Sequence, residues 1–82
     1  MSPRPRRLYM PRPVSVLADR GGPPRAVAGL AVEAVREEWL LEDLWWAPEP
    51  IRRHYFELAL ADGRVATVFR CVRSGRWYRQ RA

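Results

Sequence analysis

Arginine and aromatic side chains alternate at the C-terminal end of the chain, in the segment SGRWYRQRA (residues 74–82). Trp77 and Tyr78 are adjacent there, and arginines flank them on both sides. Proteins that bind single-stranded nucleic acid use this combination, because guanidinium groups contact phosphates while aromatic rings stack on bases. Each stacked base contributes roughly 1 to 3 kcal/mol. In the other interpretation, Trp77 packs beneath a sheet and the arginines are only solvated. The segment therefore indicates either a nucleic-acid surface or the last strand of a small sheet.

Few other residues have types that carry chemistry. His54 has no neighbouring nucleophile in the sequence, and a thiol on an apolar face has a raised pKa, so we expect His54 to be structural and Cys71 to lie in the core. One cysteine and one histidine fall short of four zinc ligands. A divalent cation needs several converging oxygens, but the acidic residues of the middle segment alternate with apolar ones and indicate a solvated edge instead. These acidic residues are Glu37, Glu38, Glu42 and Asp43. We expect no catalytic residue, no metal site, no cofactor and no enzymatic activity.

Charge is segregated along the chain. Residues 1–25 carry a net charge of +5, residues 26–63 a net charge of −5, and residues 64–82 a net charge of +6. All 15 basic residues are arginine, which suits bidentate phosphate contacts, although a GC-rich genome produces the same bias. An anionic partner would be attracted to the two ends and repelled by the middle.

The first 13 residues, MSPRPRRLYMPRP, contain four prolines and four arginines. They offer too little apolar surface to pack and too much proline for a helix. We therefore predict a flexible basic arm at residues 1–13 and a single small domain at residues 14–82. The chain has no apolar run of roughly 20 residues and its basic start lacks the apolar stretch of a signal peptide, so we expect a cytoplasmic protein.

A β-hairpin is the clearest element, at HYFELALADGRVATVFRC (residues 54–71). Two alternating runs flank Asp62-Gly63, a dipeptide typical of two-residue type I′ turns. Such a turn pairs Ala61 with Arg64 and thereby sets every other pair of the hairpin. The predicted core face then holds the pairs Leu60–Val65, Leu58–Thr67, Phe56–Phe69 and His54–Cys71. The reverse face holds Ala59–Ala66, Glu57–Val68 and Tyr55–Arg70.

A third strand is expected after Ser74-Gly75. A second two-residue turn would place Trp77 opposite Val72, on the reverse face, and would direct Tyr78 and Gln80 towards the core. A three-residue loop would exchange these two faces, because side chains alternate along a strand. The first register predicts one aromatic and cationic surface, made of Tyr55, Arg70, Trp77 and Arg79.

The N-terminal half is less regular. VSVL (residues 14–17) indicates a short strand and DRGGPP (residues 19–24) a loop, whereas residues 25–39 fit either strands around Gly29 or a helix. Prolines end this half at residues 48 and 50. Trp39, Trp45 and Trp46 are expected in or near the core, because a small domain needs large side chains to bury enough area. If one of Trp45 and Trp46 points outward, it offers a hydrophobic contact for a partner.

The segments EEWLLEDLWW, IRRHYFELALADGRVATVFRC and SGRWYRQ together resemble a family of small tryptophan-rich bacterial domains of unknown function. A similar domain lies at the C-terminal end of ImuB, the polymerase-like subunit of the bacterial mutasomes that carry out translesion DNA synthesis. The resemblance covers about residues 14–80 and departs from the family at Cys71, where relatives carry an acidic residue. It rests on Trp39, Trp45, Trp46, Arg53, Tyr55, Phe56, Asp62, Gly63, Gly75, Arg76, Trp77 and Tyr78.

The resemblance implies a strand at residues 30–38, and with it a mainly β fold: a small, strongly curved antiparallel sheet or partly open barrel. It implies no activity, but it suggests a setting in DNA repair or translesion synthesis, with a polymerase or mutasome subunit as a partner. A strand at residues 30–38 replaces the helical alternative for that segment.

Two functional hypotheses follow. The first is a non-enzymatic module that binds nucleic acid, DNA rather than RNA, through arginines and aromatic rings. Its residues are Arg4, Arg6, Arg7, Arg12, Tyr55, Arg70, Arg73, Arg76, Trp77, Tyr78, Arg79 and Arg81. The second is a protein-interaction module that docks to a polymerase or another protein, or self-associates, through the acidic stretch at residues 37–50, with Trp45 and Trp46 as contacts.

Overall fold

The computed structural model describes residues 11–43, 46, 48 and 50–80. This part of the chain folds into seven strands and contains no helix, so the predicted mainly β fold is confirmed. The strands are β1 (Arg12–Pro13), β2 (Val16–Ala18), β3 (Pro24–Val27), β4 (Leu30–Asp43), β5 (Ile51–Leu60), β6 (Val65–Cys71) and β7 (Trp77–Gln80). Since the described residues include no helix, none of them forms a helix that could cross a membrane.

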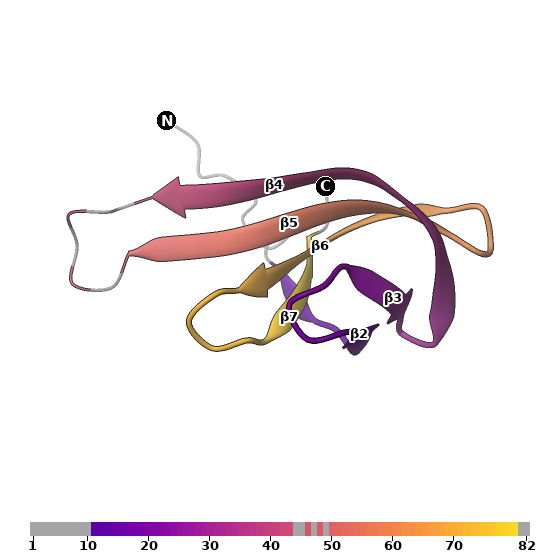
Figure 1. Ribbon diagram of the computed structural model, residues 1–82, viewed down its shortest axis with the longest axis horizontal. Coiled ribbons are helices and arrows are strands. Elements are labelled where there is room, and N and C mark those ends of the chain that lie inside the picture. The colour runs from indigo at the N-terminus through magenta and orange to yellow at the C-terminus, as the bar shows by residue number, and fades with distance from the viewer. Residues whose placement is uncertain (1–10, 44–45, 47, 49, 81–82) are drawn as a thin grey trace, which may run out of the picture.

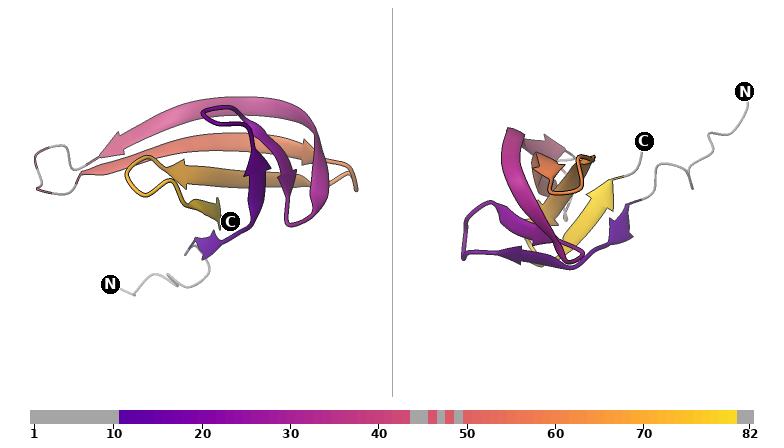
Figure 2. Two further views of the ribbon diagram at one scale, coloured as in Figure 1. Left: turned by 60° about the horizontal axis from the view of Figure 1, so that its bottom comes forward. Right: turned by 90° about the vertical axis from the view of Figure 1, so that its right-hand side faces the viewer.

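The strands form one antiparallel sheet in the order β1-β7-β6-β5-β4-β3-β2, curved into a half-barrel. The long strand β4 pairs with β3 at its first two residues, Leu30 and Ala31, then bends and pairs with β5 for the rest of its length (Figure 1). Its register shifts at two places, between Val32 and Ala34 and between Val35 and Glu37. Extra residues of this kind bend a strand and increase its twist, and here the bend brings the β2–β3 hairpin across one face of the sheet (Figure 2).

The segment at residues 25–39 forms strands on both sides of Gly29 and no helix. Val27 pairs with Leu30, so the turn between β3 and β4 has only two residues, Ala28 and Gly29. Both have positive φ angles, 50° and 86°, as a type I′ turn requires. Helix propensity is a weak preference that sheet pairing overrides. The pairing of β4 with β5 therefore makes this segment a strand and not a helix.

The hairpin of β5 and β6 exists as predicted, but its predicted register is wrong by one residue. Leu60 donates a backbone hydrogen bond to the carbonyl oxygen of Arg64, at 2.8 Å, which closes a three-residue loop instead of a two-residue turn. The Asp62 carboxylate accepts a hydrogen bond from the backbone N–H of Arg64 (3.0 Å), and Gly63 has a φ of 87°. A tight turn followed by a glycine in the left-handed region suits Asp-Gly as well as a type I′ turn does.

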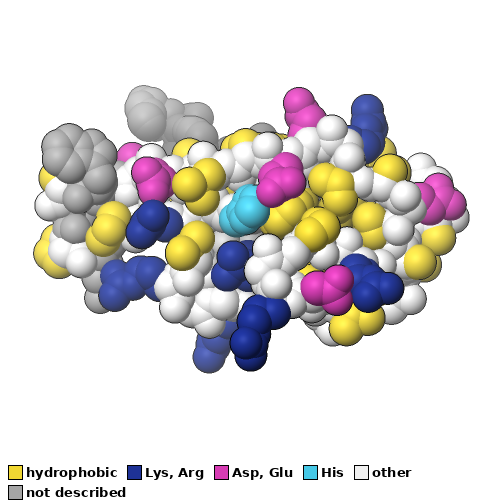
Figure 3. All heavy atoms as spheres, viewed as in Figure 1, with side chains coloured by type: hydrophobic (Ala, Val, Ile, Leu, Met, Phe, Trp, Pro, Cys, Tyr) yellow, Lys and Arg dark blue, Asp and Glu magenta, His cyan; other side chains and the backbone are white. Residues whose placement is uncertain are grey.

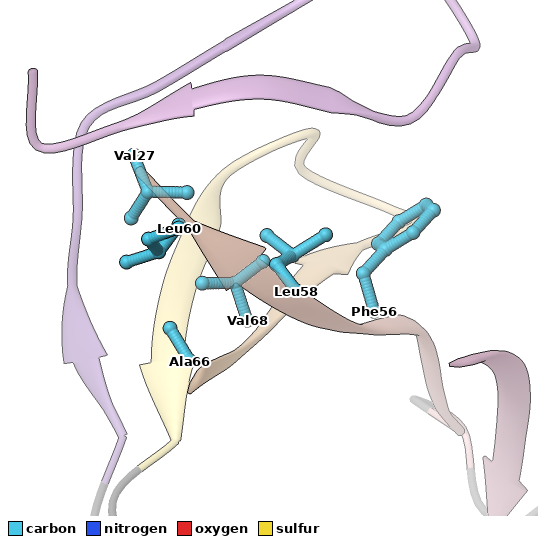
Figure 4. Close-up of a cluster of buried hydrophobic side chains, with 6 residues drawn as sticks. All are labelled: Val27, Phe56, Leu58, Leu60, Ala66 and Val68. Carbon is cyan, nitrogen blue, oxygen red and sulfur yellow. The ribbon is translucent and has the colours of Figure 1, made fainter. Parts of the chain in front are cut away.

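This one-residue difference exchanges the two faces of β6 relative to β5. Leu58 lies opposite Ala66 and not Thr67, and Phe56 lies opposite Val68 and not Phe69. We call the face that carries Leu58 the inner face and the opposite one the outer face. The buried cluster of the inner face comprises Val27, Phe56, Leu58, Leu60, Ala66 and Val68 (Figure 4).

The loop between β6 and β7 is also longer than expected. Cys71 donates a backbone hydrogen bond to the carbonyl oxygen of Arg76 (2.9 Å), so four residues, 72–75, form the loop. Trp77 lies opposite Arg70 and not Val72, on the inner face, while Tyr78 lies opposite Phe69 on the outer face. The predicted directions of Trp77 and Tyr78 are therefore both reversed, because β7 follows β6, whose faces are exchanged.

The N-terminal segment closes one edge of the sheet. Arg12 pairs with Arg79 and Pro13 with Tyr78, and Val14 donates a backbone hydrogen bond to the carbonyl oxygen of Trp77 (3.2 Å). Residues 1–10 of the predicted arm lie outside the described residues. Arg12 and Pro13, which the sequence places in the arm, belong to the sheet.

Candidate nucleic-acid interface

Three arginines surround Trp77 on the inner face of neighbouring strands. Arg79 lies between Arg12 on β1 and Val68 on β6, and Arg70 lies directly opposite Trp77. The half-buried indole of Trp77 packs against Phe56, with ring centroids 5.7 Å apart. Arg70, Trp77 and Arg79 therefore share one surface, as predicted, and Arg12 joins them.

The loop after β6 adds two more arginines. Arg73 lies within this loop and Arg76 directly follows it, and both are exposed. The described residues place no carboxylate within 4.0 Å of these two side chains or of Arg12, Arg70 and Arg79. We call these five residues the arginine set. Arg25, Arg52 and Arg64, by contrast, each form an ion pair, with Asp19, Glu42 and Asp62.

The order of the strands separates the charges across the sheet. Residues 64–80 contain no acidic residue, whereas β4, on the far side of β5, contains five. Figure 3 shows arginines gathered mostly below the histidine and carboxylates mostly above it. At this boundary the Nε2 atom of His54 lies 2.8 Å from Oε2 of Glu38. Of the carboxylates considered for a cation, Glu38 thus contacts His54 and Glu42 contacts Arg52, and the described residues contain no group that could hold a metal.

An aromatic row crosses four strands of the outer face, formed by Trp39, Tyr55, Phe69 and Tyr78. Their neighbouring ring centroids are 5.1, 4.9 and 5.3 Å apart, and the Trp39 and Tyr55 planes are within 4° of parallel. Tyr55 is only 7% exposed and Phe69 only 2%, so neither ring is accessible to a base. The predicted contact surface of Tyr55 with Trp77 is therefore wrong: the two rings lie on opposite faces.

Arg53 lies over this row. Its guanidinium carbon is 4.5 Å from the centre of the Phe69 ring, and its Nη1 donates a hydrogen bond to the Tyr55 hydroxyl (3.2 Å). A cation over an aromatic face is attracted by the ring quadrupole. Sequence reasoning gave Arg53 no function, although its position two residues before Tyr55 places both on one face of a strand.

Two hollows share the outer-face residues Arg53 and Cys71 in their lining. The larger has a volume of about 420 Å³ and is lined by Pro50, Ile51, Arg52, Arg53, Cys71 and Arg73. The smaller has a volume of about 210 Å³ and is lined by Pro11, Arg53, Phe69, Cys71 and Tyr78. Three arginines, Arg52, Arg53 and Arg73, line the larger hollow, and of these Arg52 is already paired with Glu42.

Cys71 is half-exposed on the outer face, so its predicted place in the core is wrong. Hydrogen bonds from the side chain and backbone of Ser74 lower the pKa of the Cys71 thiol, with smaller contributions from the Arg73 backbone and the charge of Arg53, while desolvation opposes them. The raised pKa expected from an apolar face is therefore also wrong, because the exchanged faces of β6 remove Cys71 from that face.

Alkylation of Cys71 should show this lowered pKa. The thiolate is the reactive form, so the rate of reaction with iodoacetamide should rise with pH around a midpoint below that of a free cysteine peptide. Ser74→Ala should move the midpoint upward, because it removes the main stabilising hydrogen bond. Ser15→Ala, at an exposed serine elsewhere, is the control and should leave it unchanged. A wild-type midpoint at or above that of the peptide would contradict this assignment.

Two tryptophans of the acidic stretch, Trp39 and Trp46, are exposed. Trp39 is 41% exposed and Trp46 is 67% exposed, which corrects their expected place in or near the core. Trp39 is exposed because β4 is paired along only one of its edges there, whereas Trp46 lies in a turn beyond the end of β4. Trp46 is exposed but lies in a turn and not in a strand, so its role as a partner contact stays a prediction. Trp45 lies outside the described residues, as do Arg4, Arg6, Arg7 and Arg81.

Comparison of the chain with protein-family models, with curated proteins and with solved structures yields no significant match.

Proposed function

We propose that this chain is a non-enzymatic module that associates with nucleic acid, and that the arginine set binds the phosphate backbone. The observation that supports it most is the placement of these five guanidinium groups on β1, β6, β7 and the loop between β6 and β7, with no carboxylate paired to any of them in the described chain. Guanidinium groups bind phosphates in bidentate fashion, and such contacts supply most of the affinity of sequence-independent binding.

The geometry favours backbone contacts over base stacking. Trp77 presents only part of its indole between Arg70 and Arg79, because the ring packs against Phe56. Arg73 lies in the loop between β6 and β7 and also lines the larger outer hollow. A single strand would therefore pass from the inner face around this loop towards Arg52 and Arg53. Contacts of this kind position a backbone without reading sequence.

DNA is the proposed nucleic acid, in a cytoplasmic DNA-repair or translesion setting. This part of the proposal rests on the resemblance to the domain of the mutasome subunit ImuB, as does the suggestion of a polymerase or mutasome subunit as a neighbour. The affinities for DNA and RNA oligonucleotides of the same sequence would show which nucleic acid the chain prefers.

The test is a titration of a labelled 12-nucleotide single strand with the full chain, followed by fluorescence anisotropy at several salt concentrations. Single-strand binding loses affinity with a log–log slope of about −0.7 for each phosphate contact, so the arginine set should give a slope of about −3 to −4. A double-stranded oligonucleotide of the same sequence is the comparison. Absence of binding at low salt, despite a net charge of +6, would overturn the proposal.

A protein-interaction module is the second candidate function. It is favoured by the exposure of Leu40 (55%) on β4 and of Trp46 (67%) in the turn that follows β4, on the opposite side of β5 from the strands that carry the arginine set.

A further inference from the structure

β4 has an unpaired edge within the described part of the chain. β3 pairs with β4 only at Leu30 and Ala31, and from Val32 onward β4 pairs with β5 alone. Figure 1 shows this part of β4 along the outside of the sheet. An edge of this kind presents backbone N–H and C=O groups that can pair with another chain.

The stretch at residues 37–43 is the regular part of that edge. Both register shifts of β4 precede Glu37, and the seven pairs from Glu37–Glu57 to Asp43–Ile51 follow without interruption. The stretch contains no proline. The opposite edge of the sheet differs, because β1 covers β7 there and contains Pro13, a residue without a backbone donor. Only the β4 edge offers a long regular ladder among the described strands.

Three neighbouring apolar side chains on this edge are accessible. Trp39, Leu40 and Leu41 are 41%, 55% and 39% exposed. Because side chains alternate along a strand, Leu40 lies on the inner face, and Trp39 and Leu41 lie on the outer face. An added strand would therefore find apolar neighbours on both faces.

The acidic charge of this edge favours a basic partner strand over a second copy of the same edge. Glu37, Glu38, Glu42 and Asp43 are acidic, and no basic residue lies between them. Like charges opposite each other destabilise a strand pair, so pairing this edge with the same edge of a second copy would place eight carboxylates side by side. A basic strand would instead meet carboxylates at both ends of the stretch, where Glu38 also contacts His54 and Glu42 also contacts Arg52.

We propose that residues 37–43 of β4 accept an extended basic segment of a partner protein, in which arginine or lysine alternates with apolar residues, and that this segment adds to the sheet as a further strand. Backbone hydrogen bonds to the edge would supply affinity, and the carboxylates and the Trp39 and Leu40 side chains would supply selectivity. This surface is separate from the arginine set, so either proposal can fail without the other.

The test uses the full chain labelled with ¹⁵N and the synthetic peptide acetyl-RVRVRVR-amide as the probe. Amide signals of residues 37–43 should shift on titration, and their hydrogen exchange should slow. The control peptide has the same sequence and charge with every backbone amide N-methylated, so it cannot form the ladder. Shifts that fall mainly on other strands, equal binding of the control peptide, or no binding at millimolar peptide would each overturn the proposal.

Matched variants separate this edge from general charge attraction. Glu37→Gln with Asp43→Asn should weaken peptide binding about threefold to tenfold, since each exposed ion pair contributes modestly. Glu33→Gln with Asp19→Asn changes the net charge equally, away from the stretch, and should leave binding unchanged. Equal weakening by both pairs would show nonspecific attraction and overturn the proposal. Sedimentation that shows a dimer strengthened by the first pair would also overturn it, because removal of facing carboxylates would then favour a second copy at the edge.

Discussion

Replacement of Arg12, Arg70 and Arg79 together by glutamine is expected to weaken binding of the 12-nucleotide single strand about 10- to 100-fold at low salt. These residues lie side by side around Trp77 on β1, β6 and β7, so one stretch of backbone can contact all of them. A loss of roughly 0.5 to 1 kcal/mol for each exposed contact gives this range. The salt dependence should fall in parallel, by about 2 in log–log slope for three lost phosphate contacts.

The control is a second triple variant with the same change in net charge. Arg20→Gln, Arg25→Gln and Arg64→Gln remove three exposed arginines, two of which already pair with Asp19 and Asp62. This variant should bind the oligonucleotide within about threefold of the wild type, with an unchanged slope. If both triples weaken binding equally, the affinity comes from net charge alone, and no interface around Trp77 exists. Circular dichroism of both variants would show that the fold is retained.

Leu58→Ala is expected to lower the free energy of unfolding by about 2 to 5 kcal/mol. Leu58 is fully buried at the centre of the inner face, and truncation there removes apolar burial and leaves a cavity. At roughly 0.05 to 0.15 kcal/mol for each residue, an 82-residue chain has about 4 to 12 kcal/mol in total, so the variant should lose a large share of its stability. Urea denaturation followed by circular dichroism measures the change.

Leu17→Ala is the matched control, because Leu17 is 66% exposed on β2. Its free energy of unfolding should stay within about 0.5 kcal/mol of the wild type, as is usual for surface substitutions. If the two alanine variants unfold at the same urea concentration, Leu58 is not a buried core residue of the inner face.

The β5–β6 hairpin shows how far the sequence could predict the site. Asp62-Gly63 identifies the turn, and the alternating runs identify the strands. The same dipeptide suits loops of two or three residues, and the choice between them decides the face of every residue of β6 and β7. The face on which Cys71, Trp77 and Tyr78 lie therefore depended on a loop length that the local sequence leaves open.

The tryptophans show a different limit. Large aromatic residues in a small domain are usually buried, and that expectation holds for the packed ring of Trp77 but not for Trp39 or Trp46. Burial of Trp39 depends on the number of neighbouring strands, and β4 has a neighbour on only one side beyond Ala31. Trp46 lies in a turn after β4, outside the paired strands. No local pattern states that a strand will lie at the edge of a sheet.

By itself, the sequence determined the β5–β6 hairpin, most turn positions and the separation of basic ends from an acidic middle, because these follow from alternation, turn residues and charge. Only the tertiary structure decided which side chains share a face, which edge remains unpaired and which arginines stand together without carboxylates. The physical reason is that strand faces repeat every two residues, so one extra loop residue reverses them. Strand neighbours, in turn, are set by hydrogen bonds between segments far apart in the chain.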